Sequence, residues 1–175
     1  MGKYYEKKNW PSFPDDMAAD LIEWSLSSER AIPASKKEPF SMLTAPWSLR
    51  QWVVENIPID LSDEWVVTIQ RFDTDYAHFH TDTIRKWSYN CLLHGEGAVT
   101  RWKEDMEGDV VETVKYDTNR WYFHNSAVPH SVSGIPKQRT AVTIYKIEPE
   151  VVGTHLATAF KFLEAHNKDP YFYYV

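Results

Sequence analysis

The part of the sequence that decides the fold is residues 87–124, which read WSYNCLLHGEGAVTRWKEDMEGDVVETVKYDTNRWYFH. Short runs rich in β-branched and aromatic residues alternate here with residues that favour turns. The turns are expected at GEG (95–97), MEGD (106–109) and DTN (117–119), and a further one at GIP (134–136). This texture predicts a β structure of short strands and argues against a parallel sheet with helical crossovers.

The same texture extends to both sides of the quoted stretch. Eight strands are expected at 65–72, 77–80, 86–94, 98–102, 110–116, 120–124, 130–133 and 140–148. About eight short strands at this spacing, with helices outside them, are typical of a jelly roll. We therefore predict a mainly β (α+β) fold, namely a double-stranded β-helix (jelly roll, cupin-like) with N-terminal and C-terminal accessory helices.

Helical signals flank the predicted strands. Asp15 or Asp16 can cap a first helix, and Pro58 ends a second one. The elements expected outside the strands are a helix to about Ser28, a loop at 31–46, a helix at 47–56, and a helix at 154–166 before an aromatic tail. We interpret the chain as one domain over 1–175, with helical support at 1–62, the β core at 63–149 and the helix and tail at 150–175.

Composition narrows the class of protein. The chain has 175 residues, a net charge of −6, and a 15% share of aromatic residues beside 25% charged ones, which indicates a folded chain with a core. The single cysteine, Cys91, excludes an internal disulfide. The acidic balance argues against a nucleic-acid partner. Because the sequence shows neither an apolar export signal nor a run of 18 apolar residues, we expect no membrane segment and a cytoplasmic location.

Two histidines and a carboxylate are candidate metal ligands. His78, His80 and Asp82 lie in AHFHTD at positions i, i+2 and i+4, which share one face of a regular strand. His130, on another predicted strand, can supply a third ligand. Two histidines and one carboxylate on one triangular face are the arrangement that binds Fe(II) with open coordination positions in non-heme oxygenases.

The order of these residues resembles a known family. His80-X-Asp82, then His130, then Arg139 nine residues later is similar to the pattern of the Fe(II)- and 2-oxoglutarate-dependent dioxygenases, and the turn-rich strands fit their double-stranded β-helix. The resemblance covers about 65–148, roughly half of the chain. It is nearest to the compact members, which are prolyl-hydroxylase-like and of phage or bacterial type.

The resemblance implies an activity and a set of cofactors. It implies Fe(II) held by His80, Asp82 and His130, with 2-oxoglutarate and O2 as co-substrates and ascorbate as a candidate addition. Arg139 would hold the 5-carboxylate of 2-oxoglutarate, and the charges of Fe(II), Asp82, 2-oxoglutarate and this arginine then cancel. The reaction would hydroxylate an unactivated C–H bond while 2-oxoglutarate is converted to succinate and CO2.

Two further positions bear on how 2-oxoglutarate would be held. Many members of the family carry Ser or Thr two positions after the arginine, where this chain has Ala141, so the second contact to the 5-carboxylate stays unassigned. Ser88, Asn90 and Leu92 alternate onto one face of their strand, and Asn90 is our candidate for a further contact to the co-substrate.

Alternatives remain open for each ligand and for the function. His124 competes with His130, His78 could replace Asp82, and Arg139 could lie on the surface. A cupin-type metalloenzyme that does not use 2-oxoglutarate is one alternative function, and a non-catalytic β-roll binding protein is another. The expected partner is a small-molecule or peptide substrate, with a peptidyl or free amino acid preferred; the sequence does not indicate an oligomeric state.

Overall fold

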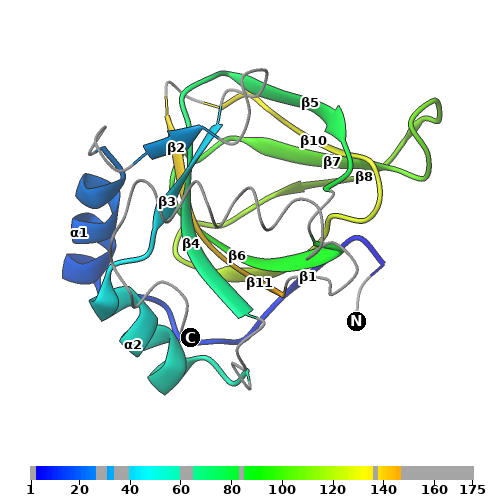
Figure 1. The fold of residues 1–175 in the computed structure, drawn as a ribbon. Helices are drawn as coiled ribbons and strands as arrows, with labels where there is room; N and C mark the ends of the chain where they lie inside the picture. The colour runs from blue at the N-terminus through cyan, green and yellow to red at the C-terminus, as the bar shows by residue number, and fades with distance from the viewer. Residues whose placement is uncertain are drawn as a thin grey trace, which may run out of the picture.

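The computed structural model describes residues 3–26, 31–33, 40–59, 65–82, 85–135 and 138–146. These residues form two antiparallel sheets that face one another (Figure 1). The larger sheet has the order β1 (Tyr5–Lys7), β9 (Trp121–Asn125), β6 (Trp87–His94), β11 (Arg139–Lys146), β4 (Trp65–Phe72), β3 (Phe40–Thr44), β2 (Ala31–Pro33). The smaller sheet has the order β5 (Tyr76–His80), β10 (His130–Ser133), β7 (Val99–Lys103), β8 (Val110–Lys115). The predicted jelly roll is confirmed.

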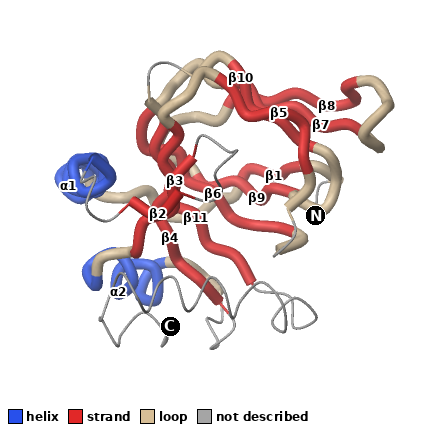
Figure 2. The backbone as a smooth tube through the Cα atoms, turned by 45° about the horizontal axis from the view of Figure 1, so that its top comes forward, coloured by secondary structure: helices blue, strands red, loops and turns tan. Residues whose placement is uncertain are grey.

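The outer face of the larger sheet carries the main hydrophobic core. Side chains alternate between the two faces of a strand, so Cys91 on β6 and Val142 on β11 point outward together with Ile69 on β4. The helices α1 (Asp15–Leu26) and α2 (Trp47–Asn56) add Leu21 and Leu49 to the same core. Figure 2 shows both helices beside the β2–β3–β4 end of the sheet. Because aliphatic side chains fill this outer face, polar side chains on these strands can be directed inward.

Between the sheets, an aromatic cluster packs one end of the interior. Leu92 on β6 and Tyr122 on β9 belong to one buried cluster with Trp102 of the smaller sheet, and the ring of Tyr5 on β1 stacks on Trp102 with centroids 5.7 Å apart. The indole Nε1 of Trp102 donates to the carbonyl oxygen of Asn125 at 3.0 Å, which satisfies its only polar atom. Part of the aromatic excess in the composition is therefore packing between the sheets.

The N-terminal third differs from the prediction. The stretch 31–46 is expected as a loop, but β2 and β3 lie within it, and β3 pairs with β4. Pro33 ends β2, at the edge of the sheet, where a proline removes no needed ladder hydrogen bond. The short strand β1 is also unpredicted and pairs with β9. β1 pairs with a strand more than 100 residues away and β3 with one about 30 residues away, so local sequence carries little signal of these pairings.

The remaining elements match the prediction within one to two residues at their ends. Strand β10 has the predicted bounds, and β4 likewise. The helix predicted at 154–166 and the aromatic tail lie outside the described residues, as does Ser28, the predicted end of the first helix. No helix in the described part of the chain is both long and apolar enough to cross a membrane.

Candidate metal centre

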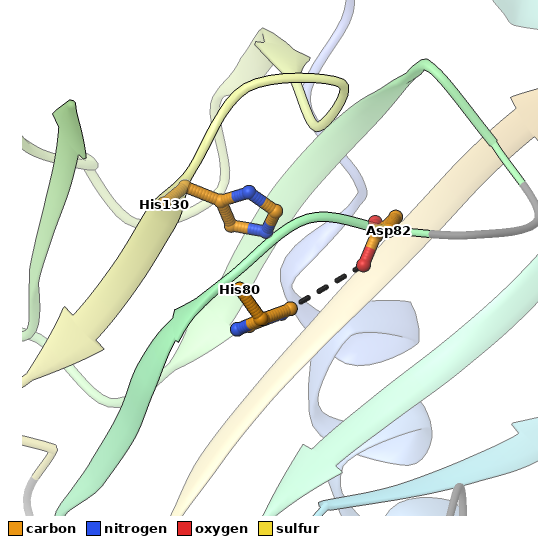
Figure 3. Close-up of side chains that lie close together, drawn as sticks. All are labelled: His80, Asp82 and His130. Atoms are coloured by element: carbon orange, nitrogen blue, oxygen red, sulfur yellow. Dashed lines mark ion pairs between the residues drawn. The ribbon is translucent and has the colours of Figure 1, made fainter. Parts of the chain in front are cut away.

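Three predicted ligands lie together between the sheets. His80 ends β5 and His130 begins β10, and the two are direct partners in the antiparallel register. Asp82 follows two residues after His80. One donor atom from each residue lies within 4.8 Å of the other two, and His80 Nε2 is 3.7 Å from Asp82 Oδ1. Figure 3 shows His130 on one strand close to His80 on the neighbouring strand, with Asp82 on the segment that follows His80.

A β-bulge in β5 decides which histidine points inward. Val132 pairs with Ala77 and His130 pairs with His80, so three steps along β5 oppose two steps along β10. The extra residue breaks the alternation that places positions i and i+2 on the same face. His78 is exposed and contacts the ring of Tyr76, whereas His80 contacts His130. The expectation that His78 and His80 share a face is wrong, and His78 lies outside the ligand group.

Backbone hydrogen bonds orient both imidazoles. Nδ1 of His80 lies 2.7 Å from the carbonyl oxygen of His78, and Nδ1 of His130 lies 3.0 Å from that of Val128. A carbonyl can only accept, so Nδ1 is the donor in each of these hydrogen bonds, and Nε2 is the ring nitrogen that remains to face a metal ion. This is the usual way in which proteins prepare a histidine for a metal ion. The backbone N–H of Asp82 donates to the carbonyl oxygen of Ser126 at 3.0 Å and holds the third residue in place.

The protonation states also suit a cation. Burial lowers the pKa of His130 to about 4, so this imidazole is neutral near pH 7. Burial alone would raise the pKa of Asp82, but the positive charge of Arg85 and the proximity of His130 and His80 bring it below its ordinary value. A neutral imidazole and an ionised carboxylate are the forms that bind metals.

The donor set is of the kind that holds a divalent ion. Ligands about 2.1 Å from an ion and at right angles are about 3 Å apart, so the observed separations, all within 4.8 Å, would have to shorten when an ion binds. The two oxygens of Asp82 face different partners: Oδ1 faces His80, while Oδ2 accepts from Arg85 Nε at 2.5 Å. Asp82 can therefore offer one oxygen to the metal while Arg85 holds the other.

Arg139 is buried, which the sequence left open. Its side chain is 5% exposed, and its guanidinium lies over the ring of Phe72 at 5.2 Å. Burial lowers the pKa of Arg139, and the neighbouring Tyr116 opposes this shift. No group in the described part of the chain accepts a hydrogen bond from its Nε. A buried guanidinium with an unused donor is costly on its own, so this position suits an anionic ligand.

A second layer of aromatic residues backs the site. The ring of His124 packs edge-on against His130 with centroids 4.7 Å apart, and its Nδ1 is 2.9 Å from the hydroxyl of Tyr116. His124 lies outside the group of converging donor atoms, so it packs beside the candidate ligand His130 and does not take its place in that group. The sequence did not single out Tyr116, because only the fold brings it to this histidine.

The inner face of the larger sheet supplies polar side chains. Asn90 on β6 pairs in register with Thr143 on β11, which in turn pairs with Thr68 on β4. The amide of Asn90 donates to Ser88 at 3.2 Å, and within the described chain no group pairs with the buried hydroxyl of Thr68. Asn90 is thus on the inner face, and its predicted contact to a co-substrate stays a prediction. Thr68 is an inward-facing polar residue that the sequence analysis missed.

Comparison with known proteins shows the fold. No protein-family model and no curated protein sequence matches the chain. A Pseudomonas putida prolyl-4-hydroxylase is 15% identical with a TM-score of 0.56, covering 83% of this chain and 94% of that one. A prolyl hydroxylase from Trichoplax adhaerens, in complex with a hypoxia inducible factor oxygen degradation domain peptide fragment, is 11% identical with a TM-score of 0.55, covering 83% and 84%.

A more distant structure shares less of the chain. A cupin domain from Bordetella pertussis Tohama I is 20% identical with a TM-score of 0.36, covering 52% of this chain and 88% of that one. At these identities the likeness to solved structures establishes a relationship at the level of the fold. The chemistry of the site has to be argued from its own residues.

Proposed function

We propose that the protein is an Fe(II)- and 2-oxoglutarate-dependent dioxygenase that hydroxylates an unactivated C–H bond and converts 2-oxoglutarate to succinate and CO2. The observation that carries the proposal is the joint presence, inside one jelly roll, of the His80–Asp82–His130 group and the buried Arg139 with its unused Nε. Without an anionic ligand, the buried charge and the unused Nε of Arg139 would stay uncompensated, which is unfavourable.

Each residue of the group has a defined task. His80 and His130 would bind the ion through Nε2, and Asp82 through Oδ1, so that one triangular face of the ion is covered. Fe(II) bound there would supply the activation of O2 and the oxidation of the C–H bond, with the opposite face left to the co-substrates. The protein contributes the orientation of these groups and the exclusion of water from the interior.

Arg139 would hold the far carboxylate of 2-oxoglutarate. Its guanidinium matches a carboxylate in shape, and the buried setting makes this ion pair strong. The hydroxyl of Tyr116, which is buried and interacts electrostatically with Arg139, is our candidate for the contact that Ala141 does not provide. We assign Asn90 to the wall of the same site because it lies on the inner face of β6.

The proposal is tested by loading the site in steps. Under anaerobic conditions, Fe(II) and then 2-oxoglutarate are added to the protein, and a weak visible charge-transfer band is expected only after both are present. Admission of air should then release succinate. A protein that binds Fe(II) without forming the band would be a cupin-type metalloenzyme, and one that binds no metal would be a binding protein; either result contradicts the proposal.

Variants at Arg139 distinguish 2-oxoglutarate binding from Fe(II) binding. Arg139→Gln removes the charge but keeps much of the volume of the side chain. Fe(II) affinity should be retained, while the 2-oxoglutarate concentration that gives half of the maximal charge-transfer absorbance should rise about tenfold or more. Arg120→Gln makes the same change on an exposed arginine and should leave both titrations as in the unmodified protein. Unchanged 2-oxoglutarate binding by Arg139→Gln would remove Arg139 from the site.

A further inference from the structure

Arg85 is a second arginine beside the candidate ligands. It follows β5 by five residues, and its side chain is 12% exposed. Nε donates to Asp82 Oδ2 at 2.5 Å, and the guanidinium lies over the ring of Tyr145 at 4.8 Å. This places a permanent positive charge next to the carboxylate that would bind the metal.

The two η nitrogens of the Arg85 guanidinium contact a neutral side chain, that of Gln70. With its side-chain oxygen turned toward Arg85, the amide of Gln70 accepts from Nη2 at 3.1 Å and from Nη1 at 3.2 Å. Each η nitrogen carries two N–H groups, so one on each is not used by these contacts. Arg85 can therefore keep Asp82 and Gln70 as partners and still donate to an incoming ligand.

The charge of Arg85 changes the balance of the loaded site. A divalent ion, Arg85 and Arg139 bring four positive charges, whereas Asp82 and dianionic 2-oxoglutarate bring three negative ones. No Asp or Glu is fully buried in the described part of the chain, so no buried carboxylate offsets the difference there. An excess of one positive charge in a largely buried site is unfavourable until an anion neutralises it.

We propose that the substrate is a small organic carboxylate of net charge −1, and that Arg85 receives its carboxylate group. This inference rests on the proposed function, because the excess charge exists only when the metal and 2-oxoglutarate are bound. A guanidinium fork and a carboxylate match in geometry, and the pair would hold the substrate next to Asp82 and hence beside the metal. The sequence-based interpretation, in which the charges cancel without Arg85, is thereby revised.

Other kinds of substrate fit the charge less well. A neutral molecule leaves the positive excess in place, and so does a zwitterionic amino acid, whose ammonium group offsets its own carboxylate. A phosphate dianion would change the net charge of the loaded site from +1 to −1. The preferred substrate is thus an acid without a compensating amine, such as an N-acylated amino acid. Of the two substrates preferred from sequence alone, a peptidyl or a free amino acid, the charge balance disfavours the free amino acid.

The test compares acids with their neutral amides. The site is saturated with Mn(II), in place of Fe(II), and with 2-oxoglutarate. The probes are propionate and propionamide, benzoate and benzamide, and N-acetyl-L-leucine and N-acetyl-L-leucinamide. Dissociation constants come from the broadening of each probe's proton NMR signals by Mn(II). The proteins compared are the unmodified chain, Arg85→Gln, Arg85→Lys and the surface control Arg120→Gln.

The proposal expects at least one acid to bind about tenfold or more tightly than its amide to the unmodified chain and to Arg120→Gln. Arg85→Gln should remove that preference, and Arg85→Lys should keep part of it. The proposal is overturned if no acid binds more tightly than its amide, or if Arg85→Gln retains the preference. It is also overturned if Arg85→Gln weakens only the binding of 2-oxoglutarate, because Arg85 would then bind the co-substrate and not the substrate.

The Fe(II)–2-oxoglutarate band, recorded separately for each variant, distinguishes the two levels of failure. If the band is absent from the unmodified chain, the proposed function fails and the substrate inference fails with it. If the band forms but acids and amides bind alike, the substrate inference alone is wrong.

Discussion

Gly95 lies against the backbone of Arg139 so closely that a Cβ at position 95 would be 2.8 Å from Arg139 Cβ and 2.9 Å from Arg139 Cα. Gly95 also has φ +106, a conformation that residues with a side chain rarely adopt. It belongs to the turn between β6 and β7, whereas Arg139 begins β11. A turn glycine therefore allows the arginine that would anchor 2-oxoglutarate to reach its buried position.

Gly95→Ala should displace Arg139 and weaken 2-oxoglutarate binding by about tenfold or more, because the clash is with backbone and Cβ atoms that cannot move aside. Fe(II) affinity should be nearly unchanged. Gly97→Ala is the matched control, since Gly97 also has a positive φ, but a Cβ added there would meet no atom within 4 Å. An equal loss of 2-oxoglutarate affinity in the two variants would show that backbone strain, and not contact with Arg139, is responsible. Unchanged affinity in Gly95→Ala would contradict the prediction.

The β-bulge in β5 predicts opposite results for two neighbouring histidines. His80→Ala removes a ligand and should abolish high-affinity Fe(II) binding, and Asp82→Ala should do the same. His78→Ala removes an exposed side chain and should bind Fe(II) as the unmodified protein does. Metal content after dialysis against limiting Fe(II) measures the difference. Comparable loss of iron from the variants at His78 and His80 would contradict the register assigned to β5.

The hydrogen bond between Tyr116 and His124 should contribute to stability. Tyr116→Phe leaves Nδ1 of the buried His124 without its partner, which costs about 1–3 kcal/mol in the free energy of unfolding. Tyr122→Phe is the comparison, because its hydroxyl bonds at 2.9 Å to the largely exposed Asp117, whose oxygens can turn to water instead. Urea unfolding of both variants tests this, and a smaller loss for Tyr116→Phe than for Tyr122→Phe would refute it.

The metal-free protein should lose stability in mild acid. Burial lowers the pKa of His130 to about 4 and that of His124 well below its ordinary value. Histidines in the unfolded chain titrate near ~6.5, so the unfolded state binds more protons than the folded state as the pH falls below that value. The stabilising contribution is complete above the unfolded pKa and declines from about pH 6.5 toward pH 4.

Urea midpoints of the metal-free protein at pH 7, 6 and 5 would measure this decline. His130→Phe removes one of the two groups and should flatten the dependence. A midpoint that stays constant over this range would mean that both imidazoles are accessible to protons in the folded state.

The sequence alone determined the class of fold and most of the candidate site. Strand-forming runs and turn residues are local signals, so the strands from β4 to β11 could be placed within a residue or two. The spacing of His80, Asp82, His130 and Arg139 is likewise visible in the chain. The resemblance built on that order indicated a ligand set that the structure then brought together.

What only the tertiary structure decided depends on contacts between distant segments. The bulge that turns His80 inward and His78 outward exists because β5 pairs with β10, about 50 residues away in sequence. Strand β3 forms because β4 offers it a paired edge. The net charge of the candidate site also depends on the tertiary structure, because the fold places Arg85 in an ion pair with Asp82, and electrostatic balance depends on distances in space and not along the chain.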